Sequence, residues 1–320
     1  MTDWRPTSGP DAAKRRAGML RRLRAYFDEE SVLEVDTPAL SPAAVSDIHI
    51  ESLAASSCLT AAPLFLHTSP EFCMKRLLAS GYPDIYSICR VFRDAELGRA
   101  HQPEFTMVEW YRLDFGLSEI ISDTIAAIAA ASGDPTLKDR VVTVDYRDAF
   151  VRACGIDPTA ASISDLAEAA DADADLRRTL GDERDDWLDL LMTTRVAPHF
   201  ARDSLTVVKH YPASQAALAR LCPDDNEVAD RYEVFIGMLE LANGYVELTD
   251  ARTQLSRIAD DQAARSRREI PLRPHDENLI AALESGLPAC AGVAMGLERL
   301  QLMLDKTDDI RNVIPFPFET

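Results

Sequence analysis

Two strand-like segments separated by a long polar loop constrain the fold of this chain more than any other feature. Residues 85–93 and 105–112 are rich in β-branched and aromatic side chains, which favour strands. The charged loop between them predicts an antiparallel hairpin, and long loops in compact domains are often functional. Arg93 is the last residue before the loop. Glu109 and Tyr111 share one face of the returning strand, because side chains alternate with a period of two.

A second region combines strand composition with evenly spaced acidic residues. The stretch RYEVFIGMLELANGYVEL carries Glu233, Glu240 and Glu247, spaced seven residues apart. A two-residue turn at 236–237 would place Glu233 opposite Glu240. A turn at the Asn-Gly pair 243–244, the stronger hairpin signal, would place Glu240 opposite Glu247. A bulge at either point would instead reset the alternation of side chains by one residue, so that the residues after it face the other side of the sheet.

Carboxylates that face each other on adjacent strands repel, so a cation is expected to lie between them. The candidates are a divalent metal ion, a lysine or arginine side chain, and the ammonium group of a substrate. Mg²⁺ bound by one or two carboxylates together with phosphate oxygens is the commonest such arrangement. The alternative is that these glutamates point to solvent on an edge hairpin.

The stretch GVAMGLERL predicts a strand, a turn and a helix. Leu297 and Leu300 begin an apolar helical face, and Gly296 suits a backbone that a ligand approaches closely. Arg299 falls in the first turn of the helix, where the helix end already favours an anion. The alternative is a core helix with one solvated arginine. Arg93 and Arg299 suit phosphate binding, but the absence of a Walker A or G-x-G-x-x-G motif excludes P-loop and Rossmann sites.

The remaining patterns indicate an α+β fold with an antiparallel sheet. A helix is predicted to begin with Ser69 as N-cap and Pro70 at the first helical position. Residues 40–60 are rich in Ser and Ala and are expected to be irregular. Residues 135–204 are expected to be a helical insertion with an acidic, solvated face. No linker or repeat divides the chain, which predicts a single domain spanning residues 1–320.

Composition argues against several classes of function. The chain carries 34 basic and 53 acidic residues, a net charge of −19, which disfavours a broad nucleic-acid surface. The basic segment 12–30 has the apolar spacing of an amphipathic helix. No apolar run reaches the ~18 residues of a membrane span. The six scattered cysteines are expected to be reduced, in the cytoplasm, and the six histidines form no H-E-x-x-H, which argues against a zinc site.

Three segments together resemble the motifs of class II aminoacyl-tRNA synthetases. VLEVDTPAL resembles motif 1, the dimer-interface motif, VFRDAELGRAHQPEFTMVEWYR resembles motif 2, and GVAMGLERL resembles motif 3. The motifs occur in the expected order, and the resemblance runs from about residue 12 to the C-terminus. ELANGYVEL is close to the lysine enzymes of this class. The resemblance implies an antiparallel sheet flanked by helices.

Only about a dozen residues precede the first predicted helix, so the anticodon-binding OB domain of lysyl-tRNA synthetases is not expected. The chain is therefore similar to the lysyl-tRNA synthetase paralogues that attach (R)-β-lysine to a lysine of elongation factor P. This implies a ligase that uses ATP and Mg²⁺ to activate (R)-β-lysine or lysine as the adenylate. It also implies a cytoplasmic homodimer built through motif 1, without stable tRNA binding. The alternatives are a truncated lysyl-tRNA synthetase with another acceptor and a non-catalytic, amino-acid-binding paralogue.

The resemblance also assigns roles to residues. Arg93, on the α-phosphate and the substrate carboxylate, and Arg299, on the γ-phosphate end of ATP, would be the catalytic residues. Glu233 and Glu240 would bind Mg²⁺. The other expected ATP contacts are Asp94, Ala95, Glu96, His101, Gln102, Glu240, Leu241 and Gly296.

The amino acid would occupy a second group of residues. Glu71 would bind the amine nearest the carboxylate, and Asn243 would touch the carboxylate. Glu247 and Tyr111 would bind the distant ε-ammonium group. The complete expected set is Ser69, Pro70, Glu71, Glu109, Tyr111, Asn243, Glu247 and Ala294.

Three positions depart from the lysine enzymes. Ala95 stands where motif 2 usually has the glutamate that contacts adenine, so either Glu96 takes that role or adenine is held by backbone and stacking. Gln102 stands where asparagine is usual. Ala294 stands where lysyl-tRNA synthetases usually have glycine, and the paralogues resemble this chain in having alanine. One methyl group there would favour a β-amino acid by about 1–3 kcal/mol.

Overall fold

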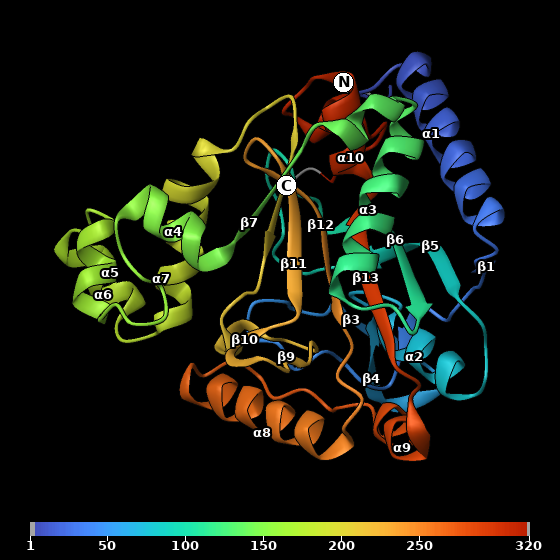
Figure 1. Ribbon diagram of the computed structural model, residues 1–320. Coiled ribbons are helices and arrows are strands. Elements are labelled where there is room, and N and C mark those ends of the chain that lie inside the picture. The colour runs from blue at the N-terminus through green and yellow to red at the C-terminus, as the bar shows by residue number, and fades with distance from the viewer. Residues whose placement is uncertain (1–3, 319–320) are drawn as a thin grey trace.

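An eight-stranded sheet forms the centre of the structure (Figure 1). The computed structural model describes residues 4–318. The strand order is β1-β5-β6-β13-β12-β11-β8-β7. The bounds are β1 (Leu33–Glu34), β5 (Ile85–Phe92), β6 (Glu104–Leu113), β7 (Val141–Asp145), β8 (Leu205–Lys209), β11 (Arg231–Ile236), β12 (Leu239–Val246) and β13 (Cys290–Gly296). Neighbouring strands run antiparallel except for β1 with β5 and β7 with β8, which are parallel. The predicted antiparallel α+β fold is confirmed, with a parallel pair added at each edge.

Side-chain alternation gives the sheet one apolar and one polar face. Val108, Val234 and Val293 belong to the apolar face and are buried in one cluster with residues of three helices. These helices are α1 (Pro10–Glu29), α3 (Leu117–Ser132) and α10 (Leu297–Asp305). Glu109 and Ala294 follow these valines in sequence, so they lie on the opposite, polar face.

Three helices, a hairpin and a small sheet border the polar face of the main sheet. They are α2 (Glu71–Ala79), α8 (Ala251–Arg267), α9 (Glu277–Gly286), the hairpin of β9 (Leu221–Cys222) and β10 (Asp225–Ala229), and a small sheet of β2 (Leu40–Ser41), β4 (Thr60–Leu66) and β3 (Ala54–Ser57). Both α2 and α8 pack on α9, and Figure 1 shows α8 and α9 below the ends of the strands. Within residues 4–318, no helix is long and apolar enough to cross a membrane.

The small sheet corrects one expectation. Residues 40–60 are not irregular throughout, because β2, β3 and the start of β4 lie within them. The sequences of β2 and β3, Leu-Ser and Ala-Ala-Ser-Ser, lack the β-branched residues that usually mark strands. These strands are held by pairing with β4, where Phe65 is buried.

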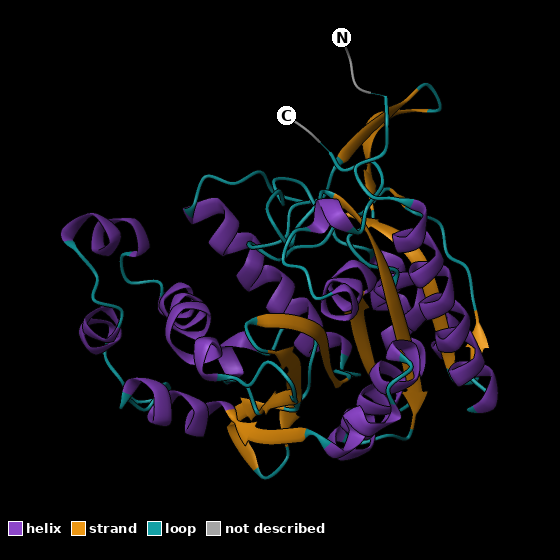
Figure 2. Ribbon diagram, turned by 90° about the horizontal axis from the view of Figure 1, so that it is seen from above, coloured by secondary structure: helices purple, strands orange, loops and turns teal. Residues whose placement is uncertain are grey.

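The acidic segment 135–204 is mainly helical and supplies most of a second apolar cluster, which Val208, Tyr211 and Phe235 complete. Its elements are α4 (Tyr146–Cys154), α5 (Ile163–Ala169), α6 (Ala174–Leu180), α7 (Arg184–Leu191), a π-helical turn (Met192–Val196) and two 3₁₀ turns (Pro135–Asp139 and Ala197–His199). Phe150 and Trp187 are buried in this cluster. Figures 1 and 2 both show these helices gathered on one side of the main sheet. The prediction of helix throughout is wrong at Val141–Asp145, where a valine-rich run forms β7 and pairs with β8.

The hairpin of β11 and β12 turns at residues 237–238, at neither of the two predicted positions. An extra residue, Leu241, forms a bulge in β12 and shifts the register. Glu233 therefore lies opposite Asn243, and neither predicted pairing of glutamates occurs. The bulge instead brings Glu240 onto the same face as Asn243.

The Asn-Gly pair lies inside β12 and not in a turn. Gly244 pairs with Tyr232 of β11, and a Cβ at Gly244 would lie 2.6 Å from the Tyr232 hydroxyl oxygen. Tyr232 is fully buried and hydrogen-bonded to Thr124 of α3. Position 244 therefore requires glycine because the Tyr232 ring packs against it. For this reason the Asn-Gly pair, the stronger of the two hairpin signals, does not mark a turn.

Candidate active site

The polar face of the sheet lines a cavity of about 960 Å³. Most of the expected site residues lie on its wall: Arg93, Glu96, His101, Gln102, Glu233, Glu240, Leu241, Gly296 and Arg299 from the nucleotide and metal set, and Ser69, Pro70, Glu71, Glu109, Tyr111, Asn243, Glu247 and Ala294 from the amino-acid set. Asp94 and Ala95 are not part of the wall. The Asp94 N–H donates to the Glu51 carbonyl at 2.8 Å, and Ala95 has a left-handed φ of 62°. The loop therefore makes a turn beside Glu51 at these two positions.

One end of the cavity is a buried acidic cluster. Glu109 lies on β6, Glu247 follows β12, and Glu71 is the first residue of α2. Lys75, one turn later in α2, lies between two of them, with Nζ 2.7 Å from Glu71 Oε1 and 2.5 Å from Glu247 Oε2. Tyr111 donates its hydroxyl group to Glu109 at 2.6 Å. Side chains from a helix and two strands thus converge on one buried polar site.

The acidic cluster contains more carboxyl groups than ammonium groups. Glu71, Glu109 and Glu247 supply carboxyl groups against the single ammonium group of Lys75. Burial, together with repulsion from Glu71, raises the pKa of Glu109 to about 8. Among residues 4–318, Glu247 Oε1 finds no hydrogen-bond partner. Because a buried carboxylate oxygen without a partner costs free energy, this end of the cavity suits a cationic ligand.

Gly292 of β13 allows the acidic cluster to close. A Cβ at this position would lie 2.5 Å from both Glu247 Oε1 and Tyr111 Cε1. Such distances are far inside van der Waals contact, so any side chain here would displace two residues of the site. The first glycine of GVAMGLERL therefore belongs to the amino-acid end of the cavity.

Ala294 lies in the middle of the cavity floor. It pairs with Asn243 of β12 on one side and with Glu109 of β6 on the other. Its methyl group lines the cavity between the two ends. A change of one carbon at this position therefore alters the width of the cavity where it meets the acidic cluster.

The start of α2 differs by one residue from the prediction. Pro70, and not Ser69, is the N-cap residue, and the helix begins at Glu71. The Ser69 hydroxyl oxygen still accepts the Glu71 N–H at 3.1 Å, which satisfies an amide that the helix leaves free. Tyr245 donates its hydroxyl group to Glu71 at 2.7 Å. Both contacts fix Glu71 at the cavity wall.

The other end of the cavity is rich in arginine. Arg299, in the first turn of α10, donates to Glu240 Oε2 at 3.0 Å and to His101 Nε2 at 2.7 Å. Burial and the Arg299 charge lower the pKa of His101, which keeps the ring neutral. Burial alone would raise the pKa of Glu240, but Arg299 and Arg93 outweigh it and lower this pKa. Arg93 Nη1 lies 3.5 Å from Glu96, and Arg93 Nε is buried with no hydrogen-bond partner in the described chain.

A third arginine supports this end from the side. Arg231 Nη2 donates to Glu233 Oε1 at 2.6 Å, and its Nη1 donates to the Gln215 carbonyl at 2.6 Å. Burial and repulsion from Glu240 raise the pKa of Glu233 to about 7. Two carboxylates on one wall, close enough to perturb each other, form an oxygen donor set of the kind that Mg²⁺ uses.

The last described residues hold the loop between β5 and β6. Gln102 is buried, and its Oε1 accepts the Phe318 N–H at 2.6 Å. The Ile310 N–H donates to the Arg99 carbonyl at 2.7 Å. Gln102 therefore lines the cavity as expected, but its side-chain oxygen binds the C-terminal segment.

Sequence reasoning missed three residues of the site: Lys75, Arg231 and Tyr245. Each lies at a spacing that places it beside an expected residue. Lys75 is four residues after Glu71 in one helix, and Arg231 is two residues before Glu233 in one strand. Tyr245 is two residues before Glu247, which is again the spacing of side chains on one face of a strand. These periodicities are the signal that would have found them.

Comparisons with known proteins agree with the motifs. Residues 2–320 match the family model described as tRNA synthetases class II (D, K and N). Similar curated proteins are each named elongation factor P–(R)-β-lysine ligase. They include those of Sodalis glossinidius (40% identical over 99% of this chain and 98% of that protein), Klebsiella pneumoniae (40%, 98% and 97%) and Pectobacterium carotovorum subsp. carotovorum (38%, 99% and 98%).

Replacing Lys75 with methionine should lower the free energy of unfolding by about 3–5 kcal/mol, because it leaves Glu71 and Glu247 buried without their cation. Urea denaturation at neutral pH measures this change. The double variant Lys75→Met/Glu247→Gln should recover part of the loss, since it removes one of the unpaired charges. The control Lys14→Met breaks an exposed pair with Asp11 and should change the midpoint little. Equal, small effects of the two lysine variants would show that Lys75 does not compensate the cluster.

Proposed function

Because the chain belongs to the class II tRNA synthetase family (D, K and N), as its motifs predict, we propose that it is a ligase that joins (R)-β-lysine to elongation factor P. The relatives that match it over nearly their whole length are named for this reaction. We further propose that ATP activates the amino acid as its adenylate. The division of the cavity into an acidic end and an arginine-rich end is the observation that supports this proposal.

The charges of the acidic end suit a diamino acid. The three carboxyl groups of the cluster exceed its single ammonium group, Lys75, so a ligand with two ammonium groups would balance it. Glu71 would receive the amine closer to the substrate carboxylate. Glu247, whose Oε1 accepts no hydrogen bond within residues 4–318, would receive the distant ammonium together with Tyr111. Asn243 of β12, four residues before Glu247, would contact the substrate carboxylate.

ATP is assigned to the arginine-rich end. Arg93 would bind the α-phosphate and Arg299 the terminal phosphate, and both guanidinium groups already line the cavity. His101 and Glu96 of the loop would border the nucleotide. Asp94 and Ala95 lie outside the cavity wall, so we assign the adenine contact to Glu96 or to backbone groups.

The reaction would proceed in two steps. A carboxylate oxygen of the amino acid attacks the α-phosphorus of ATP, the bond to pyrophosphate breaks, and an aminoacyl adenylate forms. A neutral lysine amine of the acceptor then attacks the carbonyl carbon, AMP leaves, and the amine loses its proton. The protein supplies no nucleophile. Its residues hold the reacting groups together and offset developing charge.

Mg²⁺ would bind at Glu233 and Glu240, whose carboxylates fit its preference for oxygen ligands. When bound, it would neutralise phosphate charge. In its absence the same two carboxylates pair with Arg231 and Arg299. These arginines therefore keep the carboxylates oriented until the nucleotide and its metal ion arrive.

The remaining proposals concern assembly and location. We propose that the chain acts in the cytoplasm as one catalytic domain with a helical insertion, without stable tRNA binding. A homodimer through motif 1 is supported by Leu33 and Leu40, which each expose 46% of their surface there.

Light scattering should give the mass of a dimer, and Leu33→Glu should shift it toward the monomer. A wild-type monomer at working concentration would contradict the dimer.

Pyrophosphate exchange tests the proposed activation step. Purified protein with ATP and Mg²⁺ should exchange pyrophosphate with (R)-β-lysine, and Glu240→Ala or Arg299→Ala should reduce exchange by at least about 100-fold with an unchanged circular dichroism spectrum. Arg178→Ala, on the exposed surface of α6, is the matched control and should keep normal exchange. Absence of exchange with every amino acid would refute the ligase activity. Efficient charging of tRNA with lysine would refute the proposed acceptor.

Ala294→Gly should raise activity with L-α-lysine relative to (R)-β-lysine, because it removes the methyl group between Glu109 and Asn243. A steric effect of this size is worth about 1–3 kcal/mol, or roughly 10- to 200-fold in kcat/KM. Ala291→Gly on the opposite face of β13 controls for the loss of strand propensity. An unchanged preference in Ala294→Gly would mean that Ala294 serves packing alone.

Binding of the diamino acid should release protons at neutral pH. In the free cavity Glu109 has a pKa of about 8 and holds its proton at pH 7, whereas a bound ammonium group favours the ionised carboxylate. Affinity should therefore rise as the pH rises toward 8. Calorimetry in buffers of different ionisation enthalpy would measure the released protons. Glu109→Gln should lower their number, and Glu247, whose pKa burial also raises to about 8, supplies the rest. Proton uptake on binding would contradict this charge balance.

A further inference from the structure

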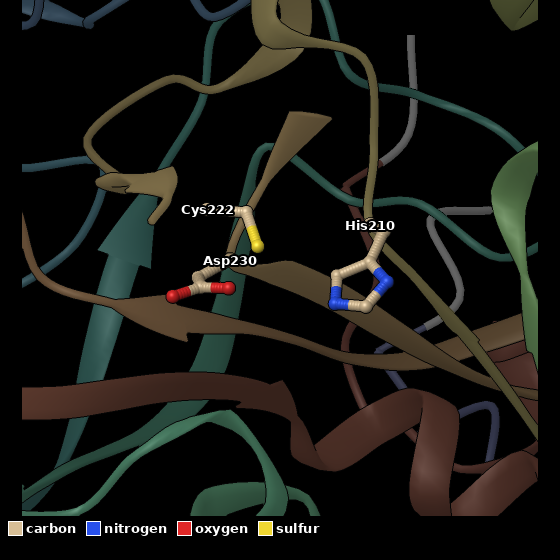
Figure 3. A group of neighbouring side chains, drawn as sticks. All are labelled: His210, Cys222 and Asp230. Carbon is tan, nitrogen blue, oxygen red and sulfur yellow. The ribbon is translucent and has the colours of Figure 1, made fainter. Parts of the chain in front are cut away.

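A histidine, a cysteine and an aspartate from the segment between β8 and β11 lie together (Figure 3). His210 directly follows β8, Cys222 ends β9, and Asp230 directly precedes β11. One ligand atom of each lies within 4.8 Å of the other two. Small side-chain rotations would reduce this spacing to the roughly 3–4 Å between neighbouring ligands of a tetrahedral zinc ion.

The hydrogen bonds around His210 prepare it for metal binding. His210 Nδ1 lies 2.6 Å from Asp145 Oδ1. Because a carboxylate only accepts, Nδ1 must carry the proton, and the lone pair is on Nε2. Figure 3 shows one ring nitrogen on the side of Cys222 and Asp230 and the other on the far side. A carboxylate that fixes a histidine in this way is the usual second partner of a histidine bound to zinc.

Asp230 is similarly fixed. It is buried, and one of its oxygens accepts from Arg220 Nε at 2.8 Å. The other oxygen can then turn to a cation. A ring nitrogen, a sulfur atom and a carboxylate oxygen from three segments thus meet at one place, which suits a bound metal ion.

We propose that His210, Cys222 and Asp230 bind one zinc ion, with a fourth position open to water or another ligand. Nitrogen, sulfur and oxygen donors of this kind are the ligand set of zinc. This site is separate from the proposed ligase chemistry. The expectation of no zinc site rested on the absence of a local motif, and these ligands come from three separate segments that only the fold brings together.

The zinc ion would link the two ends of the segment 210–230, which connects β8 to β11. The turn Ala213–Gln215 of this segment lines the cavity. The Gln215 carbonyl accepts a hydrogen bond from Arg231, the partner of Glu233. The zinc ion would therefore fix one wall of the cavity without touching substrate.

Zinc binding to metal-free protein, measured by competition with a chromophoric chelator, tests the proposal. The wild type should bind one Zn²⁺ per chain, and Co²⁺ in its place should show a thiolate charge-transfer band. Cys222→Ser and His210→Asn should lose both signals. Asparagine is chosen because it tolerates the left-handed φ of 59° at His210. Cys58→Ser, an exposed cysteine outside the cluster, should bind normally. Equal zinc affinity in the wild type and Cys222→Ser would overturn the proposal.

Two further measurements keep the test independent of folding defects. Asp145→Asn keeps all three ligands and should weaken zinc binding by about 10- to 100-fold, whereas Asp148→Asn on the same segment should not. Zinc should also protect Cys222 of the wild type from alkylation, as mapped by mass spectrometry, and leave Cys58 reactive. Alkylation of Cys222 at the same rate with and without zinc would refute the site.

Discussion

One extra residue in β12 is the constraint on which the rest of the site depends. Leu241 and Ala242 are consecutive in sequence, yet both are buried in the apolar cluster beneath α1, α3 and α10. The alternation of side chains is thereby reset, and Glu240 joins Asn243 on the cavity wall. In a regular strand these two residues, three positions apart, would face opposite sides. The bulge therefore joins the arginine-rich end and the amino-acid end on a single strand.

Electrostatics divides the cavity into two chemically distinct ends. Lys75 is surrounded by carboxylates at one end, whereas Glu240 is surrounded by arginines at the other. Each buried ion has its partner within hydrogen-bonding distance, and this compensates part of the cost of burying it. Gly292 lies at the acidic end, and the uncharged Ala294 lies between the two ends, so an amino acid and a nucleotide placed end to end can match both.

Much of the fold and the site follows from local patterns in the sequence. The β5–β6 hairpin and the helix carrying Arg299 are where alternation and the motifs predicted them, and most of the expected site residues line the cavity. The turn after β11 was predicted wrongly, because Gly244 is required by the ring of Tyr232, a contact between strands. Asp94 and Ala95 were placed in the site by resemblance, but their loop turns beside Glu51, which is distant in sequence. Tertiary contacts of this kind leave no local signal.

The attachment of segment 310–318 to the β5–β6 loop has a mechanical consequence for the nucleotide end of the cavity. The backbone amides of Phe318 and Ile310 donate to Gln102 and Arg99, which are distant from them in sequence. The loop is therefore tied to a second segment as well as to its own two strands. A displacement of the loop towards a nucleotide would have to carry segment 310–318 with it or break these hydrogen bonds.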